Sequence, residues 1–187
     1  KSHVDTNGKM QFLEEEIPAF IEPEANGTTP MSLCFQKVID FINKKYSNDS
    51  PEMPAPIIIN ISDGMPYLGG DLEVEEEIEP AASVKQAEKL MNISLHDGKP
   101  LLYNVHIGDS ATECCFIASE SDLPPNDEQA EFLFSISSKV PNEHREAAKK
   151  FGFDTPTNAR GFVSNALPDT LIRFINFGSS SHTSNLN

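Results

Sequence analysis

The first candidate for chemistry is Asp63, which directly follows an apolar run at residues 57–61. Four of those five residues are isoleucines, and such a β-branched run is typical of a strand buried on both faces of a parallel sheet. Gly64 then turns the chain, so Asp63 is placed at the carboxyl end of that strand. Open α/β sheets bind ligands at this edge. The alternative is that Asp63 only caps a turn, as Asp-Gly pairs often do.

The second candidate is Thr29, which precedes Pro30 and an amphipathic helix predicted over Met31–Tyr46. Pro30 suits the first helical position, which makes Thr29 the natural N-cap. In βαβ units each helix begins at the carboxyl edge of the sheet, so Thr29 and Asp63 are predicted to share one edge. A hydroxyl and a carboxylate are hard oxygen ligands that suit Mg²⁺. The N-cap role uses the same threonine oxygen, so both roles stay open.

The remaining elements follow from periodicity and turn residues. Further helices are predicted over 81–91, 128–138, 142–151 and 167–177, the last with Leu171, Ile172 and Ile175 inward. Strands are predicted at 101–107, 114–118 and 160–163, with 57–61 central and 101–107 beside it. Residues 1–8 are predicted to be a frayed end, followed by the tail of an edge strand. The acidic run at 71–79 is interpreted as a solvated face or as negative charge before a helix.

This alternation predicts an α/β fold, Rossmann-like and three-layered, with a mainly parallel sheet flanked by helices. We expect a single domain over 1–187 with an ordered core at about 10–178. About four strands are found where such sheets usually have five or six. The pattern therefore predicts that a first strand and helix are absent from this chain.

Composition excludes several classes of protein. The net charge of −15 argues against nucleic-acid binding, because the phosphates would be repelled. No apolar run approaches the roughly 18 residues of a membrane helix, so no membrane association is expected. Cys34, Cys114 and Cys115 form neither a disulfide framework nor a zinc motif. They are interpreted as buried thiols in a reducing cytoplasm.

One ordered series of segments resembles a von Willebrand factor type A domain. The series consists of NGTTPM, an amphipathic helix, a proline-rich loop, an apolar strand and SDG. Three later phrases resemble a bacterial cytoplasmic branch of that family: DGKPLLYNVHI at 97–107, LFSISSKVP at 133–141 and ARGFVSNALPDTLIRFINFG at 159–178. The resemblance spans about residues 10–178. One family segment, Asp-x-Ser-x-Ser, does not occur in these 187 residues.

The resemblance implies a metal-ion-dependent protein-interaction module without catalysis. Thr29 and Asp63 would hold Mg²⁺, or Mn²⁺ or Ca²⁺ in its place, with Thr28 as a substitute for Thr29, and a partner's carboxylate would fill the open position. The implied partners are a serine/threonine kinase or a metal-dependent phosphatase. Because the Asp-x-Ser-x-Ser ligands are missing, weak Mg²⁺ binding or none is expected of this chain alone.

The alternative function is a Mg²⁺-dependent α/β enzyme acting through Asp63 on a phosphorylated or nucleotide substrate. No lysine or arginine occurs between Asn48 and Val84, so the segment around Asp63 lacks a phosphate-binding cation, which favours the binding module. Three other polar residues are given structural roles. His106 is predicted to be a satisfied core histidine, Arg160 to form a salt bridge, and Asn165 to cap the last helix.

Overall fold

The computed structural model describes residues 2–4, 10–12, 28–46, 53–67, 72–108 and 112–180. Its main sheet has four strands in the order β3 (Ile57–Ser62), β4 (Leu101–His106), β6 (Phe162–Ser164) and β5 (Cys114–Cys115). β3, β4 and β6 run parallel, and β5 runs antiparallel to β6. The protein is therefore of the α/β class with a mainly parallel sheet, as predicted.

The predicted central position of the first isoleucine strand is wrong. Among the described residues β3 pairs only with β4, so it is an edge strand, whereas β4 has a partner on each side. Its isoleucines are half-buried or, at Ile61, exposed. The run is apolar because helices cover both of its faces: Ile58 packs with the α1 cluster, and Ile57 and Ile59 pack with the α5 cluster.

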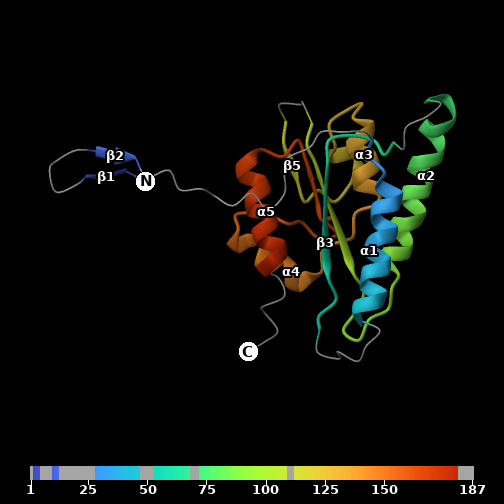
Figure 1. The fold of residues 1–187 in the computed structure, drawn as a ribbon, viewed down its shortest axis with the longest axis horizontal. Coiled ribbons are helices and arrows are strands. Elements are labelled where there is room, and N and C mark those ends of the chain that lie inside the picture. The colour runs from blue at the N-terminus through green and yellow to red at the C-terminus, as the bar shows by residue number, and fades with distance from the viewer. Residues whose placement is uncertain are drawn as a thin grey trace.

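Five α-helices accompany the sheet in the described part of the chain. Figure 1 shows helices on both sides of the sheet. They are α1 (Met31–Tyr46), α2 (Leu72–Met91), α3 (Glu128–Ser135), α4 (Asn142–Lys150) and α5 (Pro168–Ser180), with a 3₁₀ turn at Glu120–Asp122. Several predicted boundaries move: β5 ends three residues early, α5 ends three residues late, and two other helices also change. α2 takes in most of the acidic run and continues through Pro80, and α3 ends three residues early.

Two hydrophobic clusters form the core and divide the residues of β4 between them. Leu102 belongs to a largely aliphatic cluster with α1, α2 and α3, whereas Tyr103 and Val105 belong to an aromatic cluster with α4 and α5. Tyr103 stacks on Phe177 with ring centroids 6.0 Å apart. This alternation is the period of two expected of a strand covered on both faces.

The inward face predicted for the last helix is wrong for two of its residues. Ile172 and Ile175 are 60% and 38% exposed, and the buried face instead carries Phe174 and Phe177. Gly178 lies on this buried face and permits a close approach to β3, because a Cβ built there would lie 2.7 Å from Ile59 Cδ1.

Near the N-terminus, β1 (Ser2–Val4) pairs antiparallel with β2 (Met10–Phe12), so the predicted frayed end contains a strand. The strand predicted from Met10 is confirmed. The expectations for the loop that follows it, for Asp71 and for the last seven residues lie outside the described residues. No helix in the described ranges is both long enough and apolar enough to span a membrane.

Candidate functional site

The candidate site lies at the edge where β3 and β4 end, called here the carboxyl edge. Thr29 forms an isolated antiparallel bridge with Tyr67, five residues beyond the end of β3. The carbonyl of Thr29 accepts hydrogen bonds from the amides of Met31 at 2.8 Å and Tyr67 at 2.9 Å. The bridge joins residues 28–30, which precede α1, to the segment that carries Asp63. The sequence-predicted residues Thr29 and Asp63 are thus brought to the same edge.

Thr29 does not act as the predicted N-cap. The helix begins at Met31, and the carbonyl of Pro30 accepts its first intrahelical bond, from Cys34 at 3.0 Å. Glu79 of α2 occupies the capping position: its carboxylate accepts from the Ser32 amide and from the Ser32 hydroxyl, both at 2.8 Å. A carboxylate at this end of a helix also complements the helix dipole. No described residue hydrogen-bonds the Thr29 hydroxyl.

Glu79, the last residue of the acidic run, does not lie on the solvated face that was predicted. Its side chain is only 1% exposed, and the Ser83 hydroxyl is a third neighbour at 3.4 Å. The charge is buried because two donors at the start of α1 replace its water. Glu79 is therefore a structural carboxylate that joins α2 to α1.

Asp63 does not hold the turn that follows β3. The hydroxyl of Ser62 donates to the Gly64 carbonyl at 3.0 Å, and the Gly64 amide lies 3.3 Å from the same oxygen. Asp63 is exposed, and no described residue forms a hydrogen bond or ion pair with its carboxylate. Thr28 is exposed as well. Two hard oxygen groups at one edge therefore have no structural role among the described residues.

These donors are of the right kind for Mg²⁺ but too few to hold it alone. Within the described ranges, no group of three or more His, Cys, Asp or Glu side chains could hold a metal ion. Mg²⁺ gives up its water reluctantly and needs near-octahedral oxygen ligation. A hydroxyl and one carboxylate supply part of that shell, so this chain fits a divalent cation incompletely.

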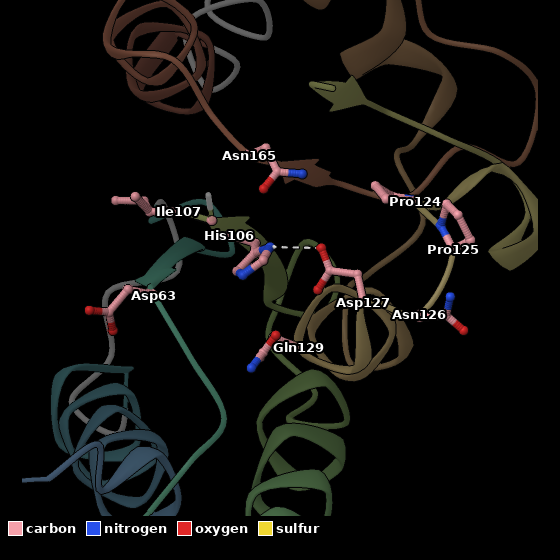
Figure 2. A pocket seen from close by; sticks show the side chains of 10 residues that line it. Asp63, His106, Ile107, Pro124, Pro125, Asn126, Asp127, Gln129 and Asn165 are labelled. Carbon is pink, nitrogen blue, oxygen red and sulfur yellow. Dashed lines mark ion pairs between the residues drawn. The ribbon is translucent and has the colours of Figure 1, made fainter. Parts of the chain in front are cut away.

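Beside Asp63, a cavity of about 640 Å³ opens at the carboxyl edge. It lies over the ends of β3 and β4, and Figure 2 shows its lining side chains. No lysine or arginine is among the described residues that line it, which are Asp63, His106, Ile107, Gly108, Pro124, Pro125, Asn126, Asp127, Gln129 and Asn165. Of these lining residues, sequence reasoning placed only Asp63 at a functional site, and it did not predict the cavity.

His106 ends β4 and is 3% exposed, as predicted for a core histidine, yet it lines the cavity. Its Nδ1 lies 3.3 Å from the Ser164 hydroxyl and 3.8 Å from Oδ2 of Asp127. Figure 2 shows the imidazole and the Asp127 carboxylate pointing toward one another. Asp127 also caps α3, because its Oδ1 accepts from the Ala130 amide at 2.9 Å. The sequence signal for this cap was Asp127 itself, because an aspartate directly before a helical run is a common N-cap.

The sequence predicted that Asn165 caps α5, and this prediction is wrong. Glu113 fills that role, since its carboxylate accepts from the Leu167 amide at 2.8 Å and the Thr170 hydroxyl at 3.0 Å. Asn165 has a φ of 53°, and its amide nitrogen donates to the Thr112 carbonyl at 3.0 Å. Its Oδ1 is buried and has no hydrogen-bond partner among the residues that the structure describes. An unsatisfied buried acceptor costs about 1–3 kcal/mol.

Gly108 makes this arrangement sterically possible. A Cβ built on it would lie 2.3 Å from Asn165 Oδ1 and 2.7 Å from His106 Cε1, so only glycine fits between them.

Arg160, for which a salt bridge was predicted, instead donates to the carbonyls of Ser135 and Ser137 and lies 5.1 Å from the Phe134 ring centroid. Arg160 is structural, but its partners are carbonyls and a ring.

Comparison of the chain with family models, curated proteins and solved structures gives no match.

Proposed function

We propose that this chain is a protein-interaction module, not an enzyme, that contacts its partner at the carboxyl edge through Thr29 and Asp63. The proposal includes a Rossmann-like three-layer fold of the von Willebrand factor type A kind and a place in the cytoplasm. It also includes Mg²⁺ as the ion shared between these residues and a carboxylate of the partner. A serine/threonine kinase or a metal-dependent phosphatase is the partner class that the sequence resemblance implies.

One observation supports the proposal most. Among the described residues, Thr29 and Asp63 have neither of the structural roles expected for them, which were to cap α1 and to hold the turn after β3. Glu79 caps α1 in place of Thr29, and Ser62 holds the turn in place of Asp63. The bridge between Thr29 and Tyr67 nevertheless keeps the two loops together. An oxygen pair that is held in place but unused by the fold is what a contact site requires.

The metal enters the proposal as a weakly held ion. Thr29 would supply its hydroxyl, or Thr28 in its place, and Asp63 its carboxylate, directly or through water. When bound, the ion supplies a positive charge that a carboxylate of the partner can meet. Because the described residues provide so few ligands, we expect millimolar rather than micromolar affinity in this chain alone, on the order of −4 kcal/mol.

Paramagnetic line broadening by Mn²⁺ in amide NMR spectra tests the proposal, because it detects weak sites. Broadening should be strongest at residues 28–31 and 62–67 and should be lost in Asp63→Asn. Asp40→Asn is the matched control, since Asp40 is an exposed aspartate on α1 away from this edge. Uniform broadening that ignores Asp63 would contradict the metal site. Micromolar binding centred on 71–79 would show that the ligands are different ones.

The enzyme alternative is weaker because the part of the cavity lining that the structure describes contains no lysine or arginine. A phosphorylated substrate would meet Asp63 and Asp127 without a protein cation to offset them. A titration with ADP in the presence of Mg²⁺ separates the two functions. Shifts confined to the cavity residues would favour the enzyme, and their absence together with the Mn²⁺ response would favour the module.

A further inference from the structure

The cavity beside His106 has acceptors without donors to satisfy them. Oδ1 of Asn165 is buried and unpaired, and Asn165 as a whole is 5% exposed. Asp127 has one carboxylate oxygen on the Ala130 amide, while the other is 3.8 Å from His106 Nδ1, which is longer than a hydrogen bond. The carboxylate of Asp63 lies in the same lining.

The orientation of the Asn165 amide is fixed by its neighbours. Its nitrogen is 3.0 Å from the Thr112 carbonyl and 3.2 Å from the Ser164 hydroxyl. Rotating the amide by half a turn would place Oδ1 against the Thr112 carbonyl, two acceptors face to face. Oδ1 therefore stays on the side of Gly108 and the cavity, where a Cβ on Gly108 would meet it at 2.3 Å. No described residue donates to Oδ1, so a ligand in the cavity is the candidate donor.

The electrostatics select the kind of donor. Two carboxylates, Asp63 and Asp127, line the cavity, its described lining holds no lysine or arginine, and the chain carries a net charge of −15. A cation is attracted to such a field, and an anion is repelled. A guanidinium group presents five N–H donors in a planar fork and no acceptor, which matches separated acceptors better than a compact ammonium does.

We infer that this cavity binds a guanidinium group, that of an arginine side chain of a protein partner. Its N–H groups would donate to Asn165 Oδ1 and to the Asp127 carboxylate, with Asp63 at long range. The cavity of about 640 Å³ is large enough for an arginine side chain and remains open to the surface. The inference requires neither a metal ion nor Thr29, so it goes beyond the proposed module and stands without it.

The test uses short peptides and amide NMR at pH 8 with EDTA present, so that the metal proposal plays no part. The probe is acetyl-Gly-Arg-Gly-amide, and the control peptide carries citrulline, which has nearly the same shape but no charge. Shifts are expected at residues 106–108, 126–129 and 165. Citrulline should bind at least about tenfold more weakly, the loss expected of a charge-assisted contact. Agmatine, a free guanidino compound, shows whether the peptide backbone adds affinity.

Two variants and a control locate the site. Asp127→Asn keeps the oxygen that caps α3 and removes the charge. It should lower the affinity for the arginine peptide by about tenfold. Gly108→Ala should abolish binding by filling the space beside Oδ1. Glu128→Gln removes an equal charge from the next, exposed residue, which is outside the cavity lining, and should leave affinity unchanged. Equal binding of citrulline, unchanged affinity in Asp127→Asn, or shifts on another face would overturn the inference.

Discussion

The carboxyl edge has an outer half at Thr29 and Asp63 and an inner half at His106, Asp127 and Asn165. In the outer half the polar side chains are exposed or partly exposed and take no part in holding the fold. In the inner half each one has a structural contact: Asp127 caps α3, and the Asn165 amide binds the Thr112 carbonyl. The outer half is therefore free to change without loss of stability, whereas the inner half couples any ligand to the stability of the fold.

The largest expected effect tests how the outer half is supported. Glu79→Ala removes the carboxylate that binds the amide and hydroxyl of Ser32. Both donors are then buried without a partner, so the free energy of unfolding should fall by about 2–3 kcal/mol in urea denaturation. Glu88→Ala, an exposed glutamate on the same helix, is the matched control. Because alanine is the better helix former, the control should lose little, and an equal loss in both variants would show that the contacts of the buried carboxylate do not set the stability.

A second pair of substitutions compares the two halves directly. Asp127→Ala should lower the free energy of unfolding by about 1 kcal/mol, because α3 loses its N-cap. Asp63→Ala should change it by less than about 0.5 kcal/mol, as is usual for an exposed residue. Thermal and chemical denaturation of the two variants measures the difference. If Asp63→Ala is as destabilising as Asp127→Ala, the outer half is structural and loses its claim to be a contact site.

Alkaline pH should destabilise the fold through two buried acids, Cys115 on β5 and Tyr103 on β4. Burial, followed by the nearby Glu113 charge, raises the pKa of Cys115 on β5 from 9.0 to about 12. Burial also raises the pKa of Tyr103 on β4. A raised pKa in the folded state means that the unfolded chain ionises first. The stability is complete below pH 9 and declines as the pH rises toward about 12. Urea denaturation between pH 8 and about 11 measures this slope, which Cys115→Ala should reduce.

The smallest effect concerns thiol reactivity and leaves the fold unchanged. Cys34 is exposed on α1, whereas Cys115 is partly buried and its raised pKa keeps it as the thiol at neutral pH. Only thiolate reacts with alkylating agents, so Cys34 should be labelled first. Mass spectrometry after brief iodoacetamide treatment reports the order. Faster labelling of Cys115 would mean that β5 opens readily in the native state.

Sequence reasoning succeeded where the determining contacts are local. The spacing of apolar residues gave the bounds of α1 correctly, and the isoleucine run located β3 and the position of Asp63 after it. It failed where distant residues meet. Glu79 caps a residue 47 positions away, and Asn165 binds a carbonyl 53 positions away. No periodic pattern reports such pairs, so the cavity was not predictable.

α5 shows a second limit of local patterns. Apolar residues occur on several sides of that helix, and the pattern alone did not decide which side faces inward. Packing against the rest of the aromatic cluster places Phe174 and Phe177 inward, and these contacts depend on the sheet and on other helices as well as on α5. The edge position of β3 escaped prediction for a similar reason, because an apolar run is compatible with any strand whose two faces are covered.

The one-sided pairing of β3 has a consequence for hydrogen exchange. Hydrogen bonds from Leu101 to Pro56 and from Ile107 to Ser62 fix the parallel register at both ends. The amides of Ile58, Asn60 and Ser62 therefore point to β4, while those of Ile57, Ile59 and Ile61 point away from it. Within the described residues no strand meets the outward set. Deuterium should thus replace amide protons along β3 with a period of two, fast at odd positions and slow at even ones.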